Sequence, residues 1–225
     1  SEGTNFTAPS KEHRAAAYNA GDYSDDYLEE FKNRDTRLYA SILFPGAQWN
    51  DLQDNFVFSW NKGGSNISKT GYNYRKMVDP SESAQSGQYK GPQNFPIIRY
   101  AEVLLTFAEA KNEVAGPSGE IYDAIDAIRL RAGMPAVNRA EVSSKEALRS
   151  LIRNERRIEL AGEGFRWDDI RRWGISQQVM TSIYSIDNDL AQQRRYDPKF
   201  IRLPYPQTAL DRNPNLMDAQ EAKGY

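Results

Sequence analysis

The sequence lacks cysteine and carries a single histidine, His13. A chain without thiols forms no disulfides, binds no metal through thiolates and has no cysteine nucleophile. One histidine in a polar N-terminal stretch gives poor support for a Ser-His-Asp triad, a histidine metal cage or a histidine general base. These two counts therefore weigh against several common classes of hydrolase and predict no metal site.

The sequence also has no large excess of charge of one sign and no long apolar run. The chain has 29 basic and 31 acidic side chains, a formal net charge of −2. This balance predicts no nucleic-acid partner and no electrostatic attachment to a membrane. No apolar run approaches the roughly 18 residues of a spanning helix, and no phosphate-binding Gly-x-x-x-x-Gly-Lys-Ser/Thr loop occurs. We therefore predict no cofactor.

Aromatic residues are plentiful, with 13 Tyr, 9 Phe and 4 Trp making 12% of the chain. Many of them fall in residues 35–96, which are rich in Gly, Asn and Ser and show weak helical periodicity. Such a segment reads as loops with short extended pieces, for example 55–60. A long irregular segment with this aromatic content is typical of a functional region and not of disorder.

The remainder of the chain predicts helices. A short helix is expected at 11–19 and another turn or two at 25–31. Apolar residues then recur at i, i+3, i+4 and i+7 in two neighbouring segments, which predicts an antiparallel helical pair resembling one tetratricopeptide unit. These residues are Ala101, Leu104, Leu105, Ala108, Ile121, Ala124, Ile125, Ile128 and Ala132. Gly116-Pro117 separates the two helices, and Ser118 is the expected N-cap of the second.

A third helix is predicted to open with a capping box of Ser143 and Glu146. Its buried stripe is expected to consist of Leu148, Leu151, Ile152 and Ile158. A short fourth helix is expected at 167–173, ending at Gly174. The four prolines of 196–225 predict an extended and looped tail that wraps the outside.

These segments also carry a family resemblance. Residues 98–110 read IRYAEVLLTFAEA, 127–133 read AIRLRAG, 154–166 read NERRIELAGEGFR and 168–174 read DDIRRWG. The remaining motifs are 33–39 (NRDTRLY), 203–206 (LPYP), 213–216 (NPNL) and the final Gly-Tyr. Together, in this order, they resemble the SusD/RagB family of nutrient-binding proteins, with Thr36 in place of that family's usual proline.

The resemblance implies a mainly α fold, in which tetratricopeptide-like hairpins pack with a long irregular, loop-rich segment and little β structure. We expect one domain over 1–225: a poorly defined lead-in (1–34), a loop-rich aromatic segment (35–96), a helical core (97–175) and a C-terminal wrap (176–225). Family members are about twice this long, with a signal peptide and a lipidated cysteine in the N-terminal half. We therefore interpret the chain as a C-terminal portion.

The implied function is non-catalytic binding of glycans at the bacterial outer surface and their delivery to a TonB-dependent, SusC-like outer-membrane transporter. The full-length protein would be lipid-anchored in the outer membrane. A sugar ring needs an aromatic face and polar groups at its rim, and the loop-rich segment offers both, with Asn61 and Lys76 among its polar residues. The predicted ligand-binding residues are Trp49, Trp60, Tyr72, Tyr74 and Asn66. For each aromatic residue, a packing role remains the alternative.

Other interpretations stay open. The charged residues of 155–166 could perform acid–base chemistry, although ion pairs that lock neighbouring helices explain them better. Trp167 and Trp173 fit helix packing better than ligand platforms. A glycoside hydrolase with paired carboxylates, a peptide-binding member of the same family and a scaffold that contacts only protein are alternatives. A calcium loop at 187–189 lacks the expected following ligands.

Overall fold

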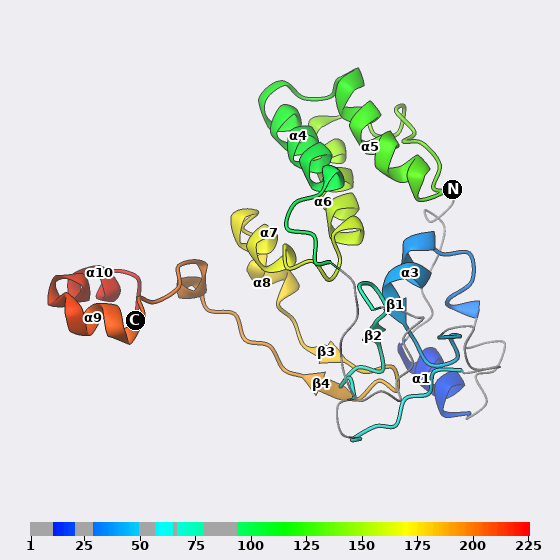
Figure 1. Ribbon diagram of the computed structural model, residues 1–225, viewed down its shortest axis with the longest axis horizontal. Coiled ribbons are helices and arrows are strands. Elements are labelled where there is room, and N and C mark those ends of the chain that lie inside the picture. The colour runs from blue at the N-terminus through cyan, green and yellow to red at the C-terminus, as the bar shows by residue number, and fades with distance from the viewer. Residues whose placement is uncertain (1–10, 21–28, 50–56, 65–66, 79–93) are drawn as a thin grey trace. The chain divides into compact units, whose positions relative to one another are not determined.

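The computed structural model describes residues 11–20, 29–49, 57–64, 67–78 and 94–225. The chain forms two compact units, the first comprising Ser1–Arg166 with Tyr184–Ala191, and the second Trp167–Ile183 with Gln192–Tyr225. The predicted mainly α class is correct: helices dominate the described residues, and the strands are short (Figure 1). The single-domain interpretation of 1–225 stays a prediction. Residues 25–28 of the predicted helical turn at 25–31 and residues 55–56 of the extended piece at 55–60 lie outside the described residues.

Three helices form the helical part of the first unit. They are α4 (Tyr100–Ala115), α5 (Gly119–Arg131) and α6 (Lys145–Glu159), and α4 packs against both of the others. The predicted break between α4 and α5 is correct, because Gly116 ends α4 with a φ of 74°, a conformation that glycine adopts without strain. Ser118 occupies the N-cap of α5 as predicted, but its side chain makes no cap hydrogen bond.

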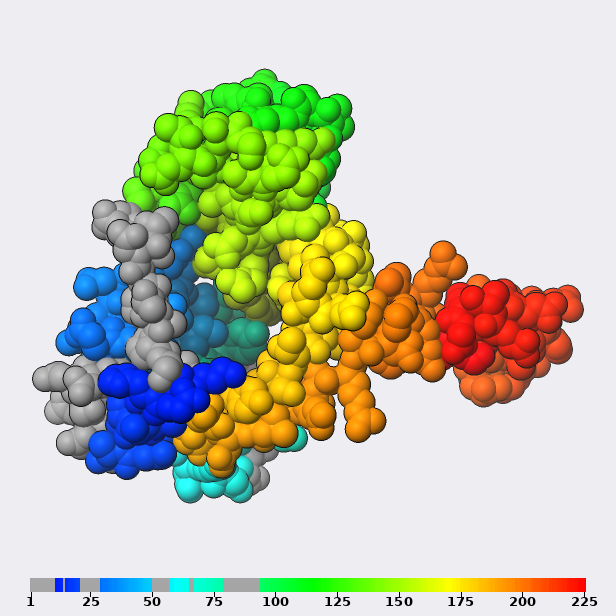
Figure 2. Space-filling model, turned by 180° about the vertical axis from the view of Figure 1, so that it is seen from behind, coloured from blue at the N-terminus to red at the C-terminus, as the bar shows by residue number. Residues whose placement is uncertain are grey.

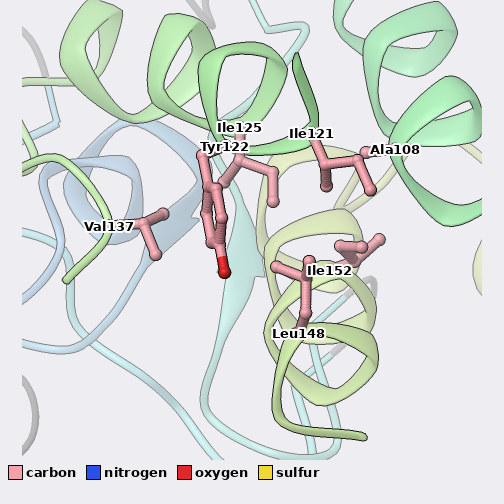
Figure 3. Close-up of a cluster of buried hydrophobic side chains, with 7 residues drawn as sticks. All are labelled: Ala108, Ile121, Tyr122, Ile125, Val137, Leu148 and Ile152. Carbon is pink, nitrogen blue, oxygen red and sulfur yellow. The ribbon is translucent and has the colours of Figure 1, made fainter. Parts of the chain in front are cut away.

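The core of this helical part is built from the predicted periodic positions. Ile121 and Ile125 of α5 face Leu148 and Ile152 of α6, and all four are fully buried (Figure 3). Ala108 of α4, Tyr122 and Val137 complete the cluster. Burying a large aliphatic side chain stabilises the fold by roughly 1.5–3 kcal/mol, so this seam holds the three helices together.

One predicted cap is displaced by one residue. The N-cap of α6 is Ser144, whose Oγ accepts a hydrogen bond from the Ala147 amide at 3.1 Å. The predicted capping box of Ser143 and Glu146 is therefore wrong. Adjacent serines present the same chemistry to a helix start, and the backbone path from the preceding turn selects between them.

The irregular part of the first unit surrounds a second core. The described elements here are α1 (Lys11–Asn19, as predicted), α3 (Thr36–Ser41), β1 (Ile42–Leu43) and β2 (Asn73–Tyr74). β1 and β2 pair antiparallel, with Ile42 opposite Tyr74. The buried residues of this core are Phe31, Phe44, Trp60 and Ile186, and the Phe31 and Phe44 rings stack with their centroids 3.8 Å apart.

Ile186 reaches this core from a distant part of the sequence. It lies in the tight turn between β3 (Ile183–Tyr184) and β4 (Leu190–Gln192), and its amide donates to the Thr70 carbonyl oxygen at 2.9 Å. The backbone of Gly71, at a φ of 88°, passes so close that an added Cβ would lie 2.7 Å from Ile186 Cγ2. Lys62 bridges Asp187 and Asp189 at the same turn, so a lysine ammonium occupies the position proposed for calcium.

The second unit consists of short elements. They are α8 (Ser176–Val179), η3 (Pro198–Ile201), α9 (Gln207–Arg212), η4 (Pro214–Leu216) and α10 (Met217–Glu221), preceded by α7 (Arg166–Arg172), which begins in the first unit. The elements α9, η4 and α10 pack into a compact lobe (Figure 2, red). The predicted extended tail is therefore wrong in part. Pro198 and Pro214 each follow an Asp or Asn cap, and proline fits the first turn of a helix instead of breaking it.

We expect Ile186→Ala to destabilise the first unit by about 2–5 kcal/mol, because it removes a fully buried side chain from the core. Chemical denaturation followed by fluorescence measures this change. Leu190→Ala, at an exposed position of the same hairpin, is the matched control and should change stability by less than about 0.5 kcal/mol. Equal effects of the two substitutions would contradict the proposed role of Ile186.

Candidate functional site

A line of buried carboxylates runs along α6 and into the loop that follows it. Glu155, Glu159 and Glu163 are spaced four residues apart, and their side chains are 1%, 3% and 1% exposed. Residues four apart share one helix face, where like charges repel. A buried carboxylate costs several kcal/mol unless a cation compensates it. Basic side chains from several distant segments meet this requirement.

Arg37 is the most deeply buried of these cations. Asp35, the N-cap of α3, accepts from the Arg37 amide at 2.9 Å and holds the guanidinium at 2.7 Å. The guanidinium then donates to Glu155 at 2.5 Å and to Glu159 at 3.1 Å. Burial alone would lower the pKa of Arg37, but these carboxylates raise it above its ordinary value. Arg37 therefore stays charged and joins α3 to α6.

Arg99 and Lys76 bind the other end of the line. Arg99 Nε donates to Glu163 and its Nη1 to Glu159, both at 2.6 Å. Lys76 Nζ donates to Glu163 at 2.6 Å and to the Glu159 carbonyl oxygen at 2.8 Å. Burial would raise the pKa of Glu163, but hydrogen bonds from Arg99 and Lys76 hold it below its ordinary value.

Two further arginines come from the end of α5. Arg129 Nη1 lies 3.1 Å from Glu155, and Arg131 Nη2 lies 2.6 Å from Glu159. Five basic side chains thus surround three buried glutamates and Asp35. These residues come from the motifs at 33–39, 98–110, 127–133 and 154–166 and from the loop containing Lys76. The interpretation of the charged residues as ion pairs between helices agrees with this geometry.

A cavity of about 270 Å³ opens beside this network. Its charged lining residues are Arg37, Lys76, Arg99, Arg131, Glu159 and Glu163. The two carboxylates are buried, whereas the side chains of Lys76 and Arg99 are 24% exposed and that of Arg131 is 61% exposed. The charge that the cavity presents to solvent is therefore positive.

Two of the predicted ligand-binding residues belong to the second core. Trp60 is 6% exposed, its Nε1 donates to the Ser68 carbonyl oxygen at 2.8 Å, and its ring lies 5.9 Å from that of Tyr18. Tyr72 packs against the same cluster, with its ring centroid 6.4 Å from that of Phe31. For Trp60 the packing alternative describes the observed environment, because its ring faces are covered by protein.

Trp49 and Tyr74 lie outside that core. The Trp49 side chain is half-buried, with the Arg75 guanidinium 5.9 Å from its ring centroid. Tyr74 is 60% exposed, and its ring lies over Gly162, where an added Cβ would come within 3.2 Å. Tyr74 does not line the cavity itself, but its neighbours do: Lys76 lies two residues further along the chain, and Glu163 follows Gly162, which the ring contacts. Asn66 lies outside the described residues.

Arg99 and Arg131 were not among the predicted ligand-binding residues, although both fall within recognised motifs. The sequence signal that could have identified them is the presence of arginines in the motifs at 98–110 and 127–133, which pack around the glutamates of 155–163 in the structure. Sequence alone does not show which of these arginines reaches solvent. Among the described residues, no cluster of three or more acidic or histidine side chains could hold a metal ion.

Comparison with known proteins identifies the family to which the chain belongs. The sequence profile described as the SusD family matches residues 2–225. The chain belongs to the SusD family. SusD-like protein P38 of Formosa agariphila is 32% identical over 81% of the chain, and SusD-like protein P2 of the same organism is 38% identical over 55%. The predicted family is confirmed.

Solved structures agree with the assignment. A SusD-like carbohydrate-binding protein from Bacteroides fragilis superposes with a TM-score of 0.70 at 29% identity, covering 82% of this chain and 42% of that one. A second SusD-like protein from that species gives the same TM-score at 30% identity. The chain spans 32% of the length of protein P38 and 25% of protein P2. In this SusD family member, no helix of the described residues is long and apolar enough to cross a membrane.

We expect Arg37→Met to destabilise the first unit by about 3–5 kcal/mol, because it leaves Glu155 and Glu159 buried with fewer counter-charges. Urea denaturation measures this loss. Arg157→Met, on an exposed position of α6, is the control and should cost less than about 1 kcal/mol. A loss below about 1 kcal/mol for Arg37→Met would contradict a central role for this ion pair.

The lowered pKa of Glu163 predicts a dependence of stability on acid. A carboxyl whose folded-state pKa lies below its ordinary value of 4.5 stabilises the fold above that pH. This stabilisation is lost as pH falls through the folded-state pKa. We therefore expect the free energy of unfolding to decline below pH 4.5, and Glu163→Gln to lower it at pH 7 and to flatten the decline. An unchanged acid profile in Glu163→Gln would contradict the prediction.

Proposed function

We propose that this chain binds glycans without turning them over, as part of a cell-surface protein that delivers them to a TonB-dependent outer-membrane transporter. Membership of the SusD family supports this proposal, as does the related Bacteroides fragilis structure described as a carbohydrate-binding protein. The transporter partner and a lipid anchor in the outer membrane are parts of the same proposal. They rest on what the family implies.

The observation that carries the proposed site is the exposed Tyr74 ring close to a cavity whose lining contains charged side chains. Carbohydrate recognition combines an aromatic face, on which the C–H face of a sugar stacks, with hydrogen-bonding groups at its rim. Tyr74 offers the face, and Lys76 and Arg131 offer donors nearby. Trp49, beside Arg75, is the second aromatic residue in the proposed ligand surface. We leave out of this surface the buried Trp60 and the half-buried Tyr72, because both pack in the second core.

A non-catalytic role fits the state of the carboxylates better than a glycosidase does. A glycosidase needs one carboxyl protonated near neutral pH, which requires a raised pKa. The pKa of Glu163 is lowered, and Glu155 and Glu159 each bind at least two arginines. A carboxyl with a lowered pKa is a poor proton donor, and the ion pairs of Glu155 and Glu159 suit these two side chains to holding the fold.

We expect Tyr74→Ala to weaken binding of the preferred oligosaccharide by about tenfold, because stacking on an aromatic ring contributes roughly 1–2 kcal/mol. A glycan array should first identify the ligand, and isothermal titration calorimetry should then compare the variants. Phe107→Ala, at an exposed aromatic position of α4, is the matched control and should leave affinity unchanged.

Trp60→Ala separates the packing role from the binding role. We expect it to destabilise the first unit by about 3–5 kcal/mol, because it empties a core position. Unchanged affinity in both Tyr74→Ala and Trp49→Ala would contradict the proposed surface. Release of shorter sugars from a bound polysaccharide would contradict the non-catalytic role.

A further inference from the structure

The cavity beside Tyr74 has an uneven distribution of charge. Its lining contains four basic side chains and two glutamates. Among the described residues, the charged groups that ion pairs join to them are Arg129, Asp35 and Glu155, which makes five basic and four acidic groups. The network therefore keeps one positive charge that no carboxylate within it balances.

That charge is presented at the mouth of the cavity. The glutamates are almost fully buried at its floor, whereas Arg131 has a side chain 61% exposed. The hydrogen bond to Glu159 uses Nη2 of Arg131. A guanidinium has five N–H donors in a planar fork that matches a carboxylate or sulfate group. A ligand entering the cavity thus meets cationic donors before it meets any carboxylate.

The size of the cavity restricts the ligand further. Sites that enclose a whole small molecule usually measure about 300–1,000 Å³, and this cavity measures about 270 Å³. It therefore suits one charged substituent, or a single sugar ring, better than an oligosaccharide. The rest of the ligand would lie outside, where the ring of Tyr74 is exposed.

We propose that this site selects acidic glycans, with a carboxylate or sulfate substituent of one sugar placed at Arg131 and Lys76 while a neighbouring sugar stacks on Tyr74. This inference rests on the proposed glycan-binding function and names its ligand class. Lys76 contributes a second positive charge to the cavity lining, where its ammonium contacts the Glu159 carbonyl oxygen and Glu163. Neutral glycans would use the Tyr74 ring and uncharged hydrogen bonds to the same donors, without the ion pair, and would bind more weakly.

The test compares two forms of one oligosaccharide by isothermal titration calorimetry. Trigalacturonate carries carboxylates, and its methyl ester has the same rings without the charge. We expect trigalacturonate to bind at least about tenfold more tightly, since a hydrogen bond to a charged group contributes more than a neutral one. The affinity advantage of trigalacturonate over its methyl ester should shrink as the sodium chloride concentration rises to about 0.5 M, because salt screens exposed charges.

Matched variants test whether the preference for trigalacturonate over its methyl ester depends on Arg131. Arg131→Gln should remove most of the affinity advantage of trigalacturonate and weaken binding of the methyl ester far less, because glutamine keeps a neutral hydrogen-bond donor at this position. Its melting temperature should stay close to that of the unmodified chain, because Glu159 keeps Arg37 and Arg99. Arg139→Gln, whose side chain is 53% exposed outside the cavity, is the control and should leave both affinities unchanged.

Two further probes separate the possible anions. Galactose 6-sulfate that competes with trigalacturonate would assign the site to sugar anions in general, and competition by potassium sulfate at equal concentration would show that the free anion suffices. The latter result would overturn selection of a glycan. Equal binding of trigalacturonate and its ester, or an unchanged advantage in Arg131→Gln, would also overturn the inference.

These results remain distinguishable from failure of the proposed function. Binding of neutral glycans that depends on Tyr74, with no gain from acidic ones, would overturn the acidic ligand class alone. Failure of all neutral and acidic glycans to bind would overturn the proposed function and this inference together.

Discussion

The burial of Glu155 and Glu159 on α6, and of Glu163 in the loop that follows it, imposes a condition on the rest of the first unit. Each carboxylate leaves water only if cations replace the lost hydration, and no single neighbouring helix supplies enough of them. Arg37 comes from α3, Lys76 from the loop after β2, Arg99 from the start of α4, and Arg129 and Arg131 from α5. The ion pairs therefore join the helical part of this unit to its irregular part. Apolar packing alone would leave the two parts with separate cores.

Much of this arrangement could be predicted from the sequence, because it follows from local patterns. The apolar periodicity of α5 and α6 identified Ile121, Ile125, Leu148 and Ile152, which form the seam between these helices. Periodicity also identified the buried face of α4, because Leu105 and Ala108 are fully buried and Ala101 and Leu104 pack against the cluster that contains Leu105. The apolar residues Tyr100, Val103 and Phe107 were not in that predicted set, and they are exposed.

The site was harder to predict, because burial of an aromatic ring depends on distant partners. Trp60 and Tyr74 look equivalent in a loop-rich segment. Ile186, more than a hundred residues further on, helps to cover Trp60, whereas Gly162 leaves room for Tyr74 to lie flat and exposed. The same limit applies to charge: the charged residues of 155–166 predicted ion pairs between helices, but only the folded geometry shows that Arg131 of α5 takes part and remains exposed. The error in the C-terminal tail had a local cause, since Pro198 and Pro214 start helical turns.

The β3–β4 hairpin has a consequence for the order in which the chain folds during synthesis. Ile186 completes the second core of the first unit, yet a ribosome makes it after the helices α4 to α6 and after the first segment of the second unit. A nascent chain that ends near Arg166 can already close the seam of Leu148 and Ile152, but the cluster around Phe31 and Phe44 still lacks one of its buried members. The irregular part of the first unit should therefore stay open to proteases until the hairpin emerges, while the helical part is already protected.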